Sequence, residues 1–156
     1  MQELTVWNSA LIQKQAVHAI LGCNARTAPF GLILTENQAI ALEQQRFYAL
    51  KENGRVEFGG GVIEKLIAAF CDSPYLCQDH YEETLHELLT IFYYYKNETL
   101  DLLSDSRLIA EMKQAYNGPC HGSLELLAGD ELERLSRDLR SGGIRGGFLT
   151  GGKDYD

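Results

Sequence analysis

The chain has 156 residues, of which 45% are hydrophobic and 23% are charged, a composition typical of a folded protein and unlike that of a disordered one. Its formal net charge of -8 argues against binding to nucleic acid or to an anionic lipid surface, since both require clustered lysine and arginine. No run approaches the roughly 20 apolar residues of a membrane span and no secretory signal is recognisable, so we predict a cytoplasmic protein with reduced cysteines.

The first predicted helix begins after Asn8 or Ser9, two residues that favour the N-cap position, and runs to about Leu21. Gly22 is expected to end this helix. A break is expected at Pro29, because proline biases the residue before it away from helical geometry.

A second helix is predicted over residues 36–52. Thr35 and Gln38 match the capping-box pattern, in which two side chains bind the free N–H groups of the first turn, and Gly54 favours the left-handed conformation that stops a helix. The residues expected on its core face are Ile40, Phe47 and Leu50. Glu43 falls inside the same face.

Two short segments have the composition of extended chain. Residues 32–34 and residues 55–58 are candidates for the two strands of a small hairpin, and the sequence leaves their pairing open. Glycines at positions 59–61 then form a tight entry turn. They precede a third predicted helix whose apolar side is formed by Val62, Ile63, Leu66, Ile67 and Phe70.

The segment from Asp79 to Asn97 gives the strongest helical signal in the chain. Apolar and aromatic residues recur at alternating steps of four and three, which places them on one stripe that should be buried. The stripe consists of Tyr81, Leu85, Leu88, Phe92 and Tyr95. Asp79 and Glu82 are expected to form a capping box at its start.

Two further helices are predicted toward the end of the chain. Ser104 is the expected N-cap of the first, and Asp130 with Glu133 is the expected cap of the second. The core stripe of the first is formed by Leu108, Ile109, Met112 and Tyr116.

Together these elements predict an all-α fold, mainly a bundle of about six helices, with at most one small β-hairpin. Residues 1–140 are expected to form a single helical domain. Residues 141–156 are expected to be a flexible tail, because six glycines in sixteen residues gain too little burial to offset the backbone entropy.

Four motifs resemble an uncharacterised family of small bacterial proteins that consist of a domain of unknown function. They are RVEFGGG from residue 55, FCDSPY from residue 70, FYYYKNE from residue 92 and SLELL from residue 123. The resemblance spans about Ala16 to Leu135, and the chain is similar to members from anaerobic gut-type bacteria. It implies a single intracellular domain and transfers no activity, cofactor or catalytic residue.

The best candidate metal ligands are His80, Glu83, His86 and Glu87, on the polar side of the predicted helix at 79–97. Glu83-x-x-His86 matches the Glu-x-x-His element of helix bundles that bind two metal ions. Those bundles need two such elements and two further glutamates that face inward, whereas this chain has one such element, which points away from the apolar stripe. A metal protein that holds Zn, Fe or Mn on this surface is therefore the alternative function, beside a simple solvated face.

The cysteines suggest two weaker possibilities. Cys77-x-x-His80 and the adjacent pair Cys120-His121 could together supply four zinc ligands, although neighbouring side chains rarely converge on one ion. A catalytic thiol at Cys71 or Cys120 is the other possibility, but no pattern around either residue identifies an activating base. We predict no catalytic residue.

Tyr93 and Tyr94 lie outside the core stripe and are the candidate partner-binding residues, since tyrosine offers a large and rigid contact area. The opposing interpretation is that helices of the same domain cover them. The sequence therefore favours a non-enzymatic protein-interaction module that binds a protein partner or associates with itself.

Overall fold

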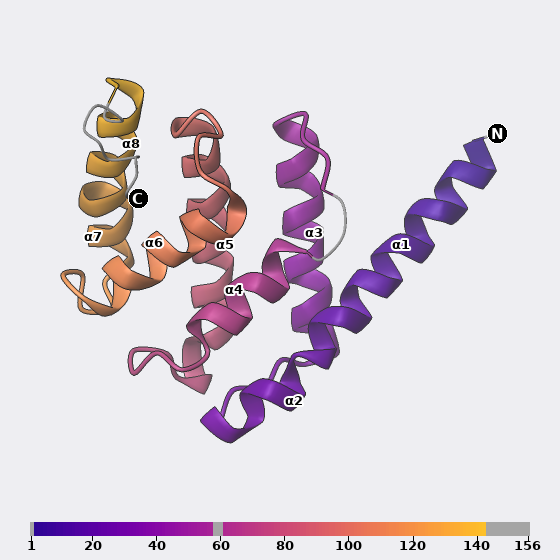
Figure 1. Cartoon of the computed structure of the whole chain (residues 1–156). Helices are drawn as coiled ribbons and strands as arrows, with labels where there is room; N and C mark the ends of the chain where they lie inside the picture. The colour runs from indigo at the N-terminus through magenta and orange to yellow at the C-terminus, as the bar shows by residue number, and fades with distance from the viewer. Residues whose placement is uncertain (1, 58–60, 143–156) are drawn as a thin grey trace. The chain divides into compact units, whose positions relative to one another are not determined.

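The structure is a computed structural model that describes residues 2–57 and 61–142 (Figure 1). Within these ranges it contains helices and turns but no β-strand, which confirms the predicted all-α fold with six helices of nine residues or more. These helices are α1 (Gln2–Gly22), α3 (Glu36–Glu52), α4 (Val62–Phe70), α5 (Tyr81–Glu98), α6 (Asp105–Asn117) and α8 (Leu132–Arg140). In the described residues, no helix is both long enough and apolar enough to cross a membrane.

Backbone contacts divide the chain into two compact units, Met1–Leu89 and Thr90–Asp156, and the boundary falls within α5. The expectation that residues 1–140 form one domain, with a flexible tail at 141–156, stays a prediction. Most of that tail, residues 143–156, lies outside the described residues.

The local helix signals in the middle of the chain are confirmed. The Thr35 N–H donates to Gln38 Oε1 at 2.9 Å and the Gln38 N–H donates to Thr35 Oγ1 at 3.2 Å, so both halves of the capping box form. Gly54 ends α3 with a φ of 62°. Ser104 caps α6 by accepting a hydrogen bond from the N–H of Arg107 at 3.1 Å. Every member of the predicted stripes on α4, α5 and α6 is buried.

Two predicted helix starts, at the two ends of the chain, are wrong. The helix α1 already begins at Gln2, so that Asn8 and Ser9 lie inside it. The last helical stretch begins at α7 (Leu124–Leu126), where the Ser123 hydroxyl accepts a hydrogen bond from the N–H of Leu126 at 3.2 Å. A π-helical turn, η3 (Leu127–Glu131), joins α7 to α8, and the predicted cap residues Asp130 and Glu133 therefore lie within a continuous helical stretch.

The start of α5 also differs from the prediction. A short 3₁₀ helix, η2 (Gln78–His80), leads directly into α5, and its N-cap residue Cys77 makes no side-chain capping bond. Asp79 thus lies inside a helical turn and not at a cap. A residue that favours the N-cap position, such as Asp, marks the start of a helix only where its own backbone is not helical.

The segment from Leu32 to Thr35 is extended, and side chains bind its backbone groups. Asn24, in α2 (Asn24–Thr27), donates from Nδ2 to the Leu34 carbonyl and accepts at Oδ1 from the Leu34 N–H, both at 2.9 Å. Gln78 binds Ile33 in the same two-bond manner, at 2.8 and 2.9 Å. These four bonds replace the pairing that a neighbouring strand would supply.

The remaining backbone groups at Leu32 are also satisfied. The Thr27 hydroxyl donates to the Leu32 carbonyl at 2.6 Å, and the Leu32 N–H donates to the Thr27 carbonyl at 3.2 Å. The backbone groups of residues 32–34 are therefore already bound and cannot pair with a second strand. Residues 55–57 accordingly form no strand. The rest of the second candidate strand and the first two glycines of the predicted entry turn, residues 58–60, lie outside the described residues. Leu32 and Leu34 are each 2% exposed and anchor the segment in the core of the first unit.

We expect Asn24→Ala to lower the free energy of unfolding by about 2 kcal/mol, because two part-buried hydrogen bonds to Leu34 are lost together. Gln78→Ala is the matched control, since it removes the same number of bonds from Ile33 at an exposed position where water replaces them. Urea unfolding followed by circular dichroism gives both values. Equal costs for the two variants would contradict the role assigned to Asn24.

Candidate functional site

The helix α3 exposes side chains that its sequence pattern assigns to the core. Ile40 is 36% exposed and Phe47 is 39% exposed, while the buried residues of the helix are Ala39, Leu42 and Glu43. The predicted core face is therefore wrong for Ile40 and Phe47, and Leu50 is only half-buried. The exposed positions form one helical stripe, which we call the outer face of α3: Ile40, Gln44, Phe47, Tyr48 and Lys51.

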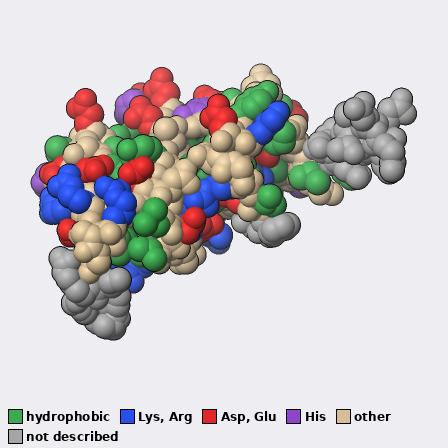
Figure 2. Space-filling model, turned by 90° about the horizontal axis from the view of Figure 1, so that it is seen from above, with side chains coloured by type: hydrophobic (Ala, Val, Ile, Leu, Met, Phe, Trp, Pro, Cys, Tyr) green, Lys and Arg blue, Asp and Glu red, His purple; other side chains and the backbone are tan. Residues whose placement is uncertain are grey.

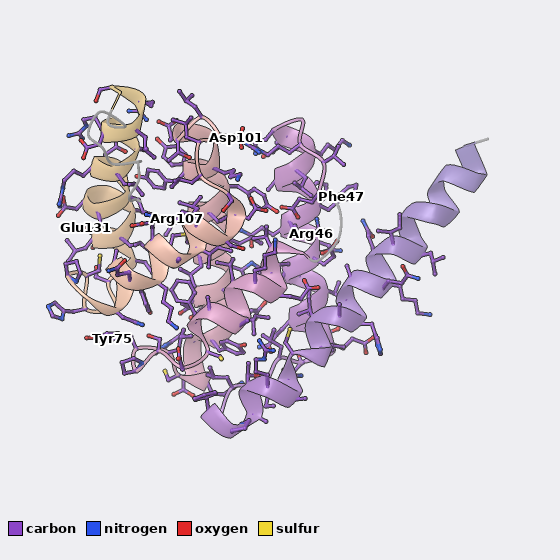
Figure 3. The ribbon with its side chains drawn as sticks, viewed as in Figure 1. Arg46, Phe47, Tyr75, Asp101, Arg107 and Glu131 are labelled. Carbon is purple, nitrogen blue, oxygen red and sulfur yellow. The ribbon has the colours of Figure 1, made fainter. Side chains whose placement is uncertain are left out.

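A part-buried ionic cluster accompanies this orientation of α3. Glu43 is 4% exposed, and its Oε1 lies 3.1 Å from Nε of Arg46. Nη1 of Arg46 also lies 3.1 Å from Oε1 of Glu57, in the segment that follows the helix. Figure 3 shows Arg46 and Phe47 extending from α3. Glu43 therefore lies on the buried side of α3, and Phe47 projects from a different side.

The cluster is electrostatically costly for its most buried member. Burial raises the pKa of the Glu43 carboxyl above its ordinary value of 4.5, and the attraction of Arg46 offsets only part of the shift. The negative charges of Glu64 and Glu57 raise the pKa of Glu43 further. The fold therefore buries the carboxylate of Glu43 at an energetic cost. Three large side chains of the same helix, Ile40, Phe47 and Tyr48, are exposed to solvent.

A pocket of about 350 Å³ adjoins α3 at its first turn. Its lining includes Leu11, Lys14, Val17, His18 and Leu21 from α1, and Glu36 from α3. Glu36 lies one helical turn before Ile40, so the pocket adjoins the side of α3 on which the outer face begins. Phe47 and Tyr48 pack edge to face within that surface, with ring centroids 5.7 Å apart. In the space-filling view, hydrophobic side chains lie among charged ones at the surface (Figure 2).

The candidate metal ligands do not form a cluster. No group of three or more His, Cys, Asp or Glu side chains that could hold a metal ion occurs in the part of the chain that the structure describes. His86 lies between two acceptors: Nδ1 contacts Oε1 of Gln45, and Nε2 lies 3.1 Å from Oε2 of Glu82. The Gln45 amide also donates to the His86 carbonyl at 2.9 Å. His86 therefore links α5 to α3, while Glu83 and Glu87 are exposed.

His80 instead lies beside a thiol. The Cys77 Sγ is 3.1 Å from Nδ1 and 3.4 Å from Nε2 of His80, and both residues are exposed. Spacing i, i+3 on a helical turn brings two side chains together, so the motif Cys-x-x-His carries the sequence signal for this contact. The sequence analysis treats the motif only as half of a zinc site and does not predict the thiol–imidazole contact itself.

The two thiols proposed from sequence for catalysis are both buried. Cys71 is 7% exposed and its Sγ lies 3.7 Å from the carbonyl of Ala68. Burial, followed by the charges of Glu131 and Asp130, raises the pKa of the Cys120 thiol. A buried thiol that stays protonated is a poor nucleophile and a poor metal ligand.

The predicted tyrosine pair is split by the structure. Tyr93 is 4% exposed and packs its ring against Phe92, with centroids 5.1 Å apart. Tyr94 is 53% exposed and packs edge to face on Tyr95. Only Tyr94 of the two offers its ring to solvent, and the assignment of the pair as a binding surface stays a prediction.

The second unit contains a buried polar contact of its own. The Tyr95 hydroxyl donates to the Ala128 carbonyl within the π-helical turn η3 and lies 3.1 Å from Oε1 of Glu133. Burial and the neighbouring Glu133 raise the pKa of Tyr95 well above its ordinary value of 10.0. A nearby pocket of about 210 Å³ is lined partly by Arg134, whose guanidinium is already bound by acidic neighbours.

Residues 19–145 match the model of a family described as a family of unknown function, DUF6323. The chain belongs to this family. The match covers the α3 side of the larger pocket, the outer face of α3 and most of both units. It confirms the resemblance to a domain of unknown function. No curated protein and no solved structure matches the chain. Membership in DUF6323 therefore assigns no activity to it.

We expect Glu43→Gln to stabilise the protein increasingly as pH rises from 4.5 toward neutrality. A raised pKa means that the folded state binds the proton more tightly than the unfolded state, so wild-type stability falls across this interval. Glutamine removes that loss and still accepts a hydrogen bond from Arg46. Urea unfolding at several pH values measures the difference, with Glu36→Gln at an exposed position as the control. A variant less stable than wild type at pH 7 would contradict the burial cost.

Proposed function

We propose that this protein is a non-enzymatic interaction module whose outer face of α3, together with the adjoining pocket, binds an amphipathic helix of a partner protein. The observation that carries the proposal is the orientation of α3. The helix buries Glu43 in the interior and leaves Ile40, Phe47 and Tyr48 at the surface. Apolar side chains that gather on one exposed helical stripe are typical of interaction sites.

The shape of this surface supports a helical partner. The pocket and the outer face of α3 follow one line along the helix, from Glu36 through Ile40 to Phe47. A partner helix that inserts apolar residues at spacing i, i+3, i+4 and i+7 would contact both parts. Figure 1 shows that the N-terminal end of α1 lies away from α3. The later turns of α3 are therefore not covered by α1.

The charges at the edge of this surface suggest how a partner is oriented. Lys14 and His18 line the pocket on the α1 side, Glu36 lies at the start of α3, and Lys51 lies at its end. Such charges at the rim of an apolar centre fix the register of a bound helix more than they add affinity. The proposal covers both a separate protein and a second copy of this chain.

We expect the double variant Ile40→Ser/Phe47→Ser to weaken partner binding at least about tenfold, since each lost apolar contact contributes on the order of 1 kcal/mol or more. Because more than half of each side chain is covered in the free protein, the free energy of unfolding should fall by about 1–3 kcal/mol, which leaves the variant folded. Light scattering after size-exclusion chromatography reports self-association. Quantitative affinity capture from the native host reports other proteins.

Val56→Ser is the matched control, because Val56 is 71% exposed and lies outside the outer face. A protein that is enriched by wild type and by Val56→Ser, but not by the double variant, supports the proposal. A monomer that captures the same proteins with all three baits contradicts it. Tyr94→Ser in the same assay tests the tyrosine prediction separately.

The alternative function, binding of Zn, Fe or Mn by His80, Glu83, His86 and Glu87, has a direct test. The bonds of His86 to Gln45 and Glu82 occupy both of its ring nitrogens, so we expect less than about one-tenth of an equivalent of metal after purification without chelator. Elemental analysis measures this content. About one equivalent that is lost in His86→Ala would favour the metal protein instead.

A further inference from the structure

The outer face of α3 has the same order of apolar and polar residues from either end, with opposite charges at the two ends. Glu36 lies one helical turn before Ile40, and Phe47 lies one turn before Lys51. All four side chains are exposed, and so is Gln44 between them. On an ideal helical wheel the five positions fall within about 80° of one another, so they form one line about 23 Å long.

This order of residues is complementary to itself. When two copies of a helix pack antiparallel about a twofold axis, residue i of one copy faces residue j of the other, and j faces i. The residue numbers of each facing pair then have a constant sum. Glu36 with Lys51 and Ile40 with Phe47 have the same sum, so one register brings both pairs together. Each of these contacts occurs twice, and Gln44 lies beside the axis.

The charges favour this register over a parallel one. A parallel pair would place Glu36 beside its own copy and Lys51 beside its own copy, which repels at both ends. Between the two ends the outer face carries no charge that opposes the antiparallel register. Among the described residues, neither Glu36 nor Lys51 makes an ion pair within its own chain. Both charges are therefore available to a second molecule.

We propose that the helix bound by the outer face is α3 of a second copy of this chain, and that two chains form a symmetric dimer with these helices antiparallel. The inference rests on the proposed function and names the partner. The partner required there is an amphipathic helix, and α3 of a second copy presents apolar residues at helical spacing together with the matching charges.

The dimer is expected to be weak. A contact between two helices of this length is smaller than a standard protein interface, so we expect a dissociation constant on the order of 10–100 µM. The net charge of -8 on each copy opposes association over long distances. The local pairing of Glu36 with Lys51 of the second copy then fixes the register.

The test is sedimentation equilibrium of the full chain over about 1–500 µM, a range that spans the expected dissociation constant. In Glu36→Lys the introduced lysine faces Lys51 of the second copy, and in Lys51→Glu the introduced glutamate faces Glu36. We expect each variant alone to dimerise about tenfold more weakly than wild type, because each reversal replaces attraction by repulsion at two contacts. An equimolar mixture of the two variants places opposite charges at both contacts. It should dimerise within about threefold of wild type.

The mixture also serves as the control for folding, because a variant that is damaged in itself is not repaired by mixing. Glu52→Lys is the matched control for net charge. Glu52 is exposed and follows Lys51, but it lies off the line of the outer face. Its reversal changes the net charge by the same amount as Glu36→Lys and should not weaken the dimer.

The outcomes separate this inference from the proposed function. A mixture that dimerises no better than either variant alone would overturn the antiparallel register. A wild-type monomer that captures another protein, which Ile40→Ser/Phe47→Ser no longer captures, overturns the dimer and supports the proposed function. A dimer that Ile40→Ser/Phe47→Ser leaves unchanged overturns the dimer contact proposed here. If that double variant also captures the same proteins as wild type, the proposed function fails as well.

Discussion

The first unit depends on how an extended stretch of four residues satisfies its backbone without a neighbouring strand. Leu32 and Leu34 bring their side chains into the core, and the backbone groups of Leu34 are part-buried, so they need partners within the protein. The amides of Asn24 and Gln78 supply donors and acceptors to that backbone. These bonds tie α2 and the turn before α5 to the entry of α3, and they remove the need for a hairpin.

A second constraint acts within α3 and connects stability to function. Arg46 binds both Glu43 and Glu57, and Glu43 lies on the face that turns inward together with Ala39 and Leu42. Burial of the Glu43 carboxyl raises its pKa, and the attraction of Arg46 offsets only part of this shift. The consequence of the observed arrangement is an apolar outer face, formed around Ile40 and Phe47, that has no covering element from α1 along its later turns.

The polar groups of α5 and of the turn before it divide into two kinds with different chemistry. His86 is committed to packing, since it connects Gln45 on α3 with Glu82 on its own helix. The ring of His80, six residues earlier, bonds only to a thiol among the described residues. The same residue type thus connects two helices at one position and lies at the surface beside a thiol at the other. The contact of His80 follows from the local Cys-x-x-His spacing, whereas the contact of His86 with Gln45 depends on how α3 packs against α5.

The sequence by itself determined the features that depend on contacts between residues one or two helical turns apart. The Thr35–Gln38 capping box, the cap at Ser104 and the buried stripes of α4, α5 and α6 all follow from hydrogen bonds and periodicity at short range. Only the tertiary structure decided the orientation of α3, since the partner of Arg46 lies 11 residues away, and the place of His86, whose partner Gln45 lies 41 residues away. Contacts at such separations depend on how the helices pack, and no local pattern encodes them.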